Sequence, residues 1–243
     1  MFSKCENLSN LKINFNTKLV EDMSNMFENN KKLISINVSE FDTNNVKSLS
    51  NMFYNCESLQ ELNLKKFKTN KVTDMSNMFY GCSSLKSLDQ EFDVSSITDL
   101  TSMFQGCSSL TNLDLHNFKT NNLKNAKSLF YGCTSLQSLN VDNFDTTQIT
   151  IFDYMFYRCN SLTSLNLSSF NTNNAKSMQF MFNSCYELTT LNIKNFNTTN
   201  CESFTSMFTS SKKIKNVIVK SNEDNQKLLD KIYVDSLVVV NEE

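Results

Sequence analysis

One eight-residue string, MFYNCESL at residues 52–59, returns in related form from one end of the chain to the other. Its Met-Phe pair begins at positions 1, 26, 52, 78, 103, 155, 181 and 207, and Leu129-Phe130 stands in the remaining place. Successive copies are therefore 25 or 26 residues apart. A fixed period of this size is typical of a solenoid, in which each unit buries its apolar face against the next. We therefore expect about nine units that share one continuous core.

Residues 52–77 and 155–180 align without a gap and define the repeating unit. Leu59, Leu62 and Leu64 form a Leu-x-x-Leu-x-Leu signature. Its last part alternates apolar and polar residues, as a half-buried strand does. We predict a strand over residues 60–65, followed by a turn at Thr69-Asn70, whose side chains are able to bond their own backbone.

A second apolar group follows the turn in every unit. In the reference unit its members are Val72, Met75, Met78 and Phe79, at offsets of 0, 3, 6 and 7 residues, a spacing that places them on one helical face. We predict a short helix over residues 73–80 that depends on stacking for its stability. The predicted fold class is an α/β solenoid, a right-handed leucine-rich-repeat-like superhelix of strand, turn and short-helix units.

Two units are one residue short, and the loss falls just before Phe15 and just before Phe92. The second short unit also has Gln90 where the inner Leu belongs. We expect a bulged strand at residues 89–91, visible as a break in backbone pairing with the neighbouring units.

The repeat pattern fades after Ser210, so we divide the chain into a solenoid at residues 1–220 and a cap at residues 221–243. Residues 222–232 have the apolar spacing of an amphipathic helix, and residues 237–240 form a mostly β-branched run. A β-α-β cap over the last open unit is the simplest interpretation. A separate functional module is the alternative.

Composition limits the classes of partner. The formal net charge is −2, and acidic and basic residues are interspersed, so there is no electrostatic footprint for nucleic acid. No apolar run approaches the roughly 20 residues that a membrane helix needs, and the N-terminal residues lack the pattern of a signal peptide. Because Met1 also fits the repeat, we expect this sequence to be a piece of a longer protein.

The eight cysteines follow the repeat, which argues against a metal site. Cys201 occupies the same column as Val72, and the others stand three residues after the repeat Phe; they are Cys5, Cys56, Cys82, Cys107, Cys133, Cys159 and Cys185. We interpret all eight as small buried hydrophobic residues with reduced thiols. One thiol per unit does not make a tetrahedral zinc site, and the CxxC pairs of such sites are absent.

No constellation of residues favours catalysis. His116 is the only histidine, and it lies at a strand position that we predict to face solvent. No candidate for an activated Ser or Cys accompanies it. Asp89, Glu91, Asp114 and Asp142 are scattered carboxylates of a kind common on solvated sheets. We predict a chain that is not an enzyme and binds no cofactor.

Two surfaces are candidates for binding a partner. The first is the polar strand face, and the second is a row of tyrosines, Tyr54, Tyr80, Tyr131 and Tyr157, for which packing between units is the alternative. For the strand face the alternative is an Asn ladder that only stabilises the stack. The candidate partner-binding residues of the strand face are Glu61, Asn63, Lys65, Asp89, Asn112, Asp114, His116, Asn140, Asp142, Asn166, Asn192 and Lys194.

The consensus Met-Phe-x-x-Cys-x-Ser-Leu-x-x-Leu-Asn-Leu-x-x-Phe-x-Thr-x-x-Val-x-x-Met-Ser-x resembles the 26-residue repeat of BspA-family leucine-rich-repeat surface proteins. The resemblance covers residues 1 to about 220 in nine phased copies. It implies a leucine-rich-repeat solenoid placed at the cell surface or secreted, with a role in adhesion. It carries over no catalytic residues, because the repeated motif is structural.

These observations together favour a non-enzymatic module that binds a protein or extracellular-matrix partner through its strand face. A structural spacer within a longer stalk is the first alternative. An intracellular scaffold or inhibitor is the second, and it is favoured more strongly if the native chain starts at Met1. Neither nucleic-acid binding nor membrane insertion is expected.

Overall fold

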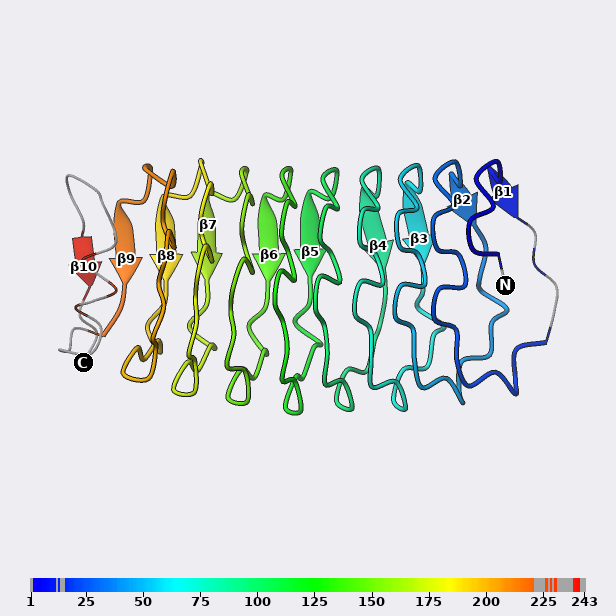
Figure 1. The fold of residues 1–243 in the computed structure, drawn as a ribbon, viewed down its shortest axis with the longest axis horizontal. Coiled ribbons are helices and arrows are strands. Elements are labelled where there is room, and N and C mark those ends of the chain that lie inside the picture. The colour runs from blue at the N-terminus through cyan, green and yellow to red at the C-terminus, as the bar shows by residue number, and fades with distance from the viewer. Residues whose placement is uncertain are drawn as a thin grey trace.

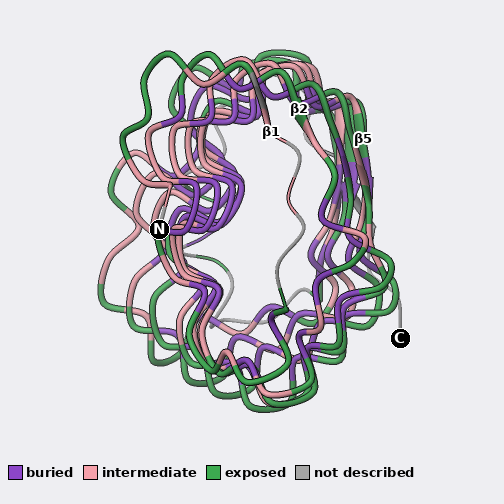
Figure 2. Ribbon diagram, turned by 90° about the vertical axis from the view of Figure 1, so that its right-hand side faces the viewer, coloured by how far each residue is buried: buried purple, intermediate pink, exposed green. Residues whose placement is uncertain are grey.

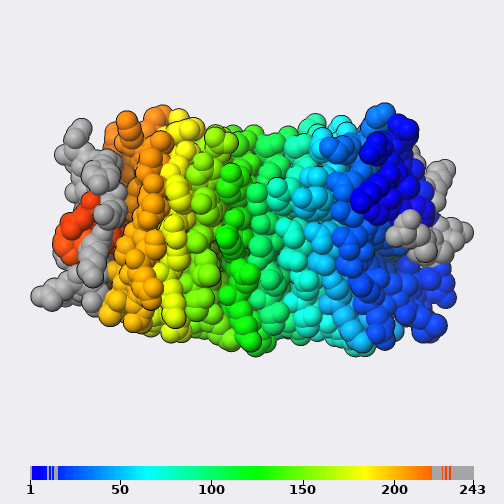
Figure 3. All heavy atoms as spheres, viewed as in Figure 1, coloured from blue at the N-terminus to red at the C-terminus, as the bar shows by residue number. Residues whose placement is uncertain are grey.

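The chain is wound into an elongated stack of repeating units. The structure, a computed structural model, describes residues 2–11, 13, 16–220, 226, 228, 230 and 238–240. Successive units lie side by side along the long axis (Figure 1), and their atoms form one closely packed body (Figure 3). The described strands are β1 (Asn10–Leu11), β2 (Ser35–Ile36), β3 (Glu61–Asn63), β4 (Ser87–Asp89), β5 (Asn112–Asp114), β6 (Ser138–Asn140), β7 (Ser164–Asn166), β8 (Thr190–Asn192), β9 (Asn216–Ile218) and β10 (Val238–Val240).

The strands run parallel and pair in register with the sequence repeat. β1 pairs with β2, β3 with β4 and β5 with β6, while β7, β8, β9 and β10 form one four-stranded sheet. Leu62 lies opposite Leu88, and Leu165 lies opposite Leu191. The alternation of exposed and buried residues in β3 confirms the predicted strand, which is shorter than residues 60–65. The solenoid with its period of about 26 residues is therefore the fold of the chain; its right-handed sense stays a prediction.

The predicted helix at residues 73–80 is wrong. This segment consists of turns and one isolated bridge residue, Asp74. The N–H groups of Met75, Asn77 and Phe79 donate to carbonyls of the next unit at 3.2, 2.8 and 2.9 Å. The N–H groups of Met78 and Tyr80 instead donate to carbonyls three residues back, those of Met75 and Asn77, at 3.2 and 3.0 Å. Within the described part of the chain, only Gln226 and Leu228 are helical.

Left-handed residues explain why the spacing of an amphipathic helix does not produce one here. Asn77 has φ 54° and Gly81 has φ 70°, and these values interrupt the right-handed run that a helix requires. Alternate N–H groups consequently point along the stack instead of along the chain. We call residues 73–80 and the equivalent residues of the other units the Met-Phe segments. Each segment bonds to the next, and together they form a second backbone ladder on a different side of the unit from the strands.

One aromatic column and one polar column complete the interior. The Phe of each Met-Phe pair stacks on its neighbours from Phe2 to Phe208, with ring centroids 5.4–5.9 Å apart. Buried threonines form a second column; Thr146, for example, donates to the Asn171 carbonyl at 2.8 Å. In the view down the stack, buried segments lie on the inner side of both long walls of each unit (Figure 2).

Backbone pairing at residues 89–91 breaks on one side only, and this break does not confirm the predicted bulge. β4 does not pair with β5, but it keeps its full register with β3, including Asn63 opposite Asp89. The same break separates β2 from β3 and β6 from β7, whose units have the ordinary 26-residue spacing, so it is not specific to the short unit. In the other short unit the site of the loss, at residues 14 and 15, lies outside the described residues.

The predicted cap falls largely outside the described residues. Within it, Leu228 is helical and buried against the core, and the Asp230 N–H donates to the Gln226 carbonyl at 2.9 Å. β10 pairs in parallel with β9.

Candidate recognition surface

The residues predicted to bind a partner lie on and directly after the strands, on the face turned away from the Leu columns. Nine of the twelve side chains are exposed, and Asn140, Asn192 and Lys194 are half-buried. The alternation within each strand produces this arrangement, because the central Leu is directed inward. The structure therefore places all twelve residues on one extended polar surface, which we call the strand face.

The Asn and Asp at the strand ends fix the local backbone. One side-chain oxygen of each residue accepts the N–H two residues later at 2.9–3.2 Å; these residues are Asn37, Asn63, Asp114, Asn140, Asn166 and Asn192. Such bonds stabilise a tight turn after each strand. In the short unit Gln90 takes over this role, with its Oε1 accepting the Phe92 N–H at 2.8 Å.

The strand face is not the continuous Asn ladder that the sequence left open as an alternative. Asn63 donates to Asp89 at 3.3 Å, and the Lys65 ammonium lies 3.0 Å from the same carboxylate. Asn166 donates to Asp142 at 3.3 Å. These contacts join neighbouring units in places, and the ion pair is exposed, so it contributes little to stability.

Asp114 and His116 form a separate pair on β5 and the turn after it. The His116 Nδ1 lies 3.0 Å from the Asp114 Oδ1. The His116 backbone N–H, helped by the imidazole, lowers the pKa of the Asp114 carboxyl below its ordinary value. The carboxylate is therefore held ionised and oriented by its own turn.

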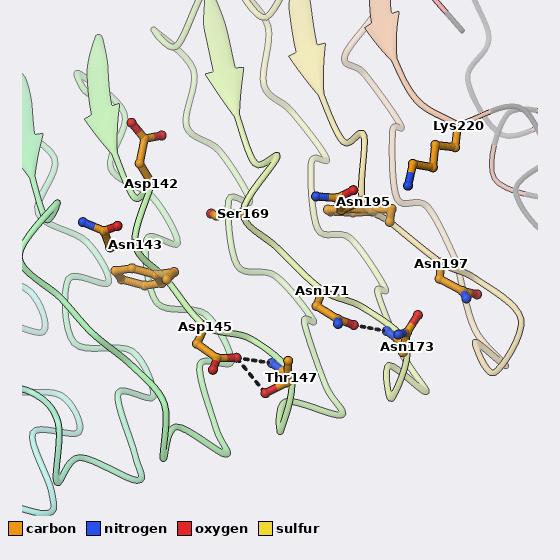
Figure 4. Close-up of a pocket in the computed structure, with 12 residues that line it drawn as sticks. Asp142, Asn143, Asp145, Thr147, Ser169, Asn171, Asn173, Asn195, Asn197 and Lys220 are labelled. Carbon is orange, nitrogen blue, oxygen red and sulfur yellow. Dashed lines mark hydrogen bonds between the residues drawn. The ribbon is translucent and has the colours of Figure 1, made fainter. Parts of the chain in front are cut away.

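A groove deepens this surface toward the C-terminal end of the stack. Its volume is about 760 Å³, and it runs across the turns that follow β6, β7 and β8 (Figure 4). Phe144 and Phe196 line it but are almost completely buried, so polar groups dominate its accessible surface. Its polar lining consists of Asp142, Asn143, Asp145, Thr147, Ser169, Asn171, Asn173, Asn195, Asn197 and Lys220.

Bonds within and between the turns hold the groove in shape. Asp145 accepts the Thr147 N–H and hydroxyl at 2.9 and 2.6 Å, and Figure 4 shows both bonds. Asn195 donates to the Ser168 carbonyl of the preceding unit at 2.6 Å. Sequence reasoning identified Asp142 here but missed the other lining residues, since they come from turns that are a whole repeat apart. Their recurrence as Asn or Asp on either side of a second Phe column, Phe144, Phe170 and Phe196, is the signal that could have identified them.

The cysteine column is confirmed as buried at six positions. Cys5 is exposed and Cys201 is half-buried, so the prediction that all eight are buried is wrong for these two. All eight are free thiols. Each of the six buried thiols donates to the carbonyl of the previous unit's repeat Phe at 3.1–3.2 Å; they are Cys56, Cys82, Cys107, Cys133, Cys159 and Cys185.

The two units without this cysteine preserve the hydrogen bond. Asn30 donates to the Phe2 carbonyl at 2.8 Å, and Ser211 donates to the Phe182 carbonyl at 2.5 Å. The column therefore satisfies a buried carbonyl in every interior unit, a role that the hydrophobic interpretation of the cysteines missed.

The residues that the structure describes contain no group of three or more His, Cys, Asp or Glu side chains placed to hold a metal ion. None of their helices is long and apolar enough to cross a membrane.

A family model described as "Mycoplasma protein of unknown function, DUF285" matches residues 1–111, 49–140 and 136–236. The chain belongs to this family. The overlapping matches extend over the whole solenoid of the DUF285 chain, while the resemblance to BspA-family repeats stays a prediction. No curated protein matches the DUF285 chain.

Two solved structures are similar to this DUF285 chain. A leucine-rich repeat protein from Bacteroides ovatus ATCC 8483 is 17% identical with a TM-score of 0.32, covering 99% of this chain and 85% of that one. A leucine-rich cell surface protein from Faecalibacterium prausnitzii A2-165 is 14% identical with a TM-score of 0.34, covering 90% of this chain and 76% of that one.

Proposed function

We propose that this DUF285 chain is a non-enzymatic recognition module that binds a protein or extracellular-matrix partner through its strand face. The observation that carries the proposal is the series of exposed and half-buried polar side chains along successive strands, which deepens into the groove beside Asp142. Placement at the cell surface rests on the resemblance of the repeat to BspA-family repeats.

Rigidity of the polar groups supports this function. The Asn and Asp side chains at the strand ends are already bonded to their own turns, as Asn140 is to the Asp142 N–H at 3.1 Å. A partner therefore immobilises few additional rotamers when it binds, and the entropy cost of association falls. The groove suits an extended hydrated segment better than a small apolar ligand, because pockets for such ligands are lined mainly by apolar groups.

Charge reversal on the strand face tests the proposal. The change is Glu61→Lys, Asp114→Lys and Asp142→Lys in one variant, and the probes are immobilised collagen, laminin and fibronectin. We expect the unchanged chain to bind at least one of them, and the variant to bind it at least about tenfold more weakly. The reason is that a new lysine repels a basic group of the partner that the carboxylate attracted, and like charges across an interface are strongly unfavourable. Biolayer interferometry on the full chain measures both affinities.

The matched control carries the same charge change elsewhere, as Glu21→Lys, Glu28→Lys and Glu202→Lys on the side of the Met-Phe segments. This control should bind as the unchanged chain does. Equal losses in both variants, or no loss in the strand-face variant, would contradict the proposed binding face. Failure to bind any of the probes would count against a matrix partner and favour the structural spacer.

A further inference from the structure

The residue directly before each Met-Phe pair has a left-handed backbone, and at two of these positions the side chain is unusually large. The position before the Met-Phe pair holds, in chain order, Asn25, Asn51, Asn77, Ser102, Ser128, Tyr154, Phe180 and Ser206. Asn tolerates a positive φ well, whereas a bulky side chain is strained there. Tyr154 has φ 59° and Phe180 has φ 56°. Within this column the strain is confined to two adjacent units.

Further departures from the repeat surround these two residues. Arg158 has φ 59° at the position where Gly106 and Gly132 stand in earlier units. Ile151 is 42% exposed at the position where Asp99 accepts the Thr101 N–H at 2.7 Å. Each change replaces a residue that suits the local turn with one that does not. Residues that conflict with the fold in this way are concentrated at functional sites.

The aromatic rings assemble into one cluster. Tyr154 stacks on Phe180 with centroids 4.9 Å apart, and Tyr131 stacks on Tyr157 at 4.7 Å. Tyr154 meets the edge of Tyr157 at 5.7 Å and joins the two pairs. All four rings are half-buried, and the Arg158 guanidinium lies 5.6 Å from the Tyr157 ring centroid. We call Tyr131, Ile151, Tyr154, Tyr157 and Phe180 the aromatic patch.

The aromatic patch has a basic border. Lys127, Arg158 and Lys176 lie on or directly after three successive Met-Phe segments around it, and all three are exposed. The acidic residue on these Met-Phe segments is Asp153, and Glu202 lies on the next segment along the stack. Asp153 is engaged within the protein, where it accepts the Ser177 hydroxyl at 2.6 Å and a backbone N–H at 2.9 Å. The charges left to face a partner are therefore mainly positive.

We propose that the aromatic patch docks an acidic segment of a partner protein that carries large apolar anchor residues. Buried aromatic rings and arginine are the groups that contribute most to protein interfaces, and the basic border complements an acidic segment. The patch lies on the Met-Phe segments, which form the long wall of each unit opposite the strands. In Figure 2 the label N lies on that wall. This surface is distinct from the strand face, so the chain is able to hold two partners at once.

Selection from a phage-displayed library of random short peptides tests the proposal. The variant Ile151→Asp, Tyr154→Asn, Arg158→Gly and Phe180→Asn restores the residues that other units carry and serves for counter-selection. We expect the unchanged chain to enrich peptides that combine Asp or Glu with Phe, Trp or Leu. The variant should bind them at least about tenfold more weakly. Its melting temperature should be equal or higher, because the left-handed positions regain suitable residues.

Ser102→Asn is the matched control, since it makes the same kind of change at the same column outside the patch. This control should leave peptide binding unchanged. The proposal is overturned if no peptide is enriched over the variant, or if the enriched peptides are basic or lack apolar residues. It is also overturned if sedimentation shows self-association of the unchanged chain that the variant abolishes, because the occupant is then a second copy.

Discussion

Raising the pH above about 9 is expected to unfold the chain over a narrow range, because six thiols are buried in their protonated form. Burial raises the pKa of Cys56, Cys133 and Cys185 to about 12. Burial also raises the pKa of Cys82, Cys107 and Cys159 well above the ordinary value.

The sign follows from the direction of these shifts. A thiol whose pKa is higher in the folded state stabilises it fully below the pKa of the unfolded chain, near 8.5, and loses this contribution as the pH approaches 12. Between these two pKa values, each of the six thiols lowers the free energy of unfolding by about 1.4 kcal/mol per pH unit. The six together lower it by about 8 kcal/mol per pH unit. A total stability of about 5–15 kcal/mol is exhausted within one to two pH units.

Urea unfolding between pH 7 and pH 11 in a reducing buffer measures this loss. The control is the double variant Cys107→Ser and Cys133→Ser, since a serine hydroxyl does not titrate in this range and Ser211 already makes the same bond to Phe182. The control should show about two thirds of the slope, because four of six titrating thiols remain. A free energy of unfolding that stays constant to pH 10 would show that the column thiols are not buried.

Phe104→Ala is expected to lower the free energy of unfolding by about 3–5 kcal/mol, since it removes a completely buried ring from the middle of the stack. Phe104 lies between Phe79 and Phe130, with centroids 5.6 and 5.9 Å away. Both contacts are lost and a cavity is left. Because each unit contacts only its neighbours, the variant should also unfold in two steps as its halves separate. Chemical denaturation followed by circular dichroism measures both effects.

Phe208→Ala is the comparison at the end of the same column. Among the described residues Phe208 stacks on Phe182 alone, at 5.4 Å, and it retains 6% exposure. We expect its loss to cost clearly less than that of Phe104 and to leave a single transition. Equal costs at the two positions would argue against a stack whose stability comes from contacts between units.

Much of the fold was predictable because the repeat reports which side chains are buried. The strand positions of Leu62, Leu113 and Leu165 are confirmed, and so is the placement of polar residues such as Asn63 on the outer surface. Alternation with a period of two has few interpretations in a short segment, so strand and core followed directly from it.

The helix prediction failed because apolar spacing alone does not distinguish a helical face from a series of tight turns. The missed signal was the position of the three glycines, Gly81, Gly106 and Gly132, which all stand in one left-handed column. The groove beside Asp142 was also missed, because its walls come from turns in different units. Only the stacking of units brings those turns together.

We expect the backbone ladder through the Met-Phe segments to hold the units together as firmly as the strands do. Native-state hydrogen exchange tests it most directly. We expect the amides of Phe53, Phe79, Phe130 and Phe156, which donate to the next unit at 2.9–3.0 Å, to exchange as slowly as the Leu113 amide of β5. Rapid exchange at these phenylalanines beside protected strand amides would contradict the second ladder.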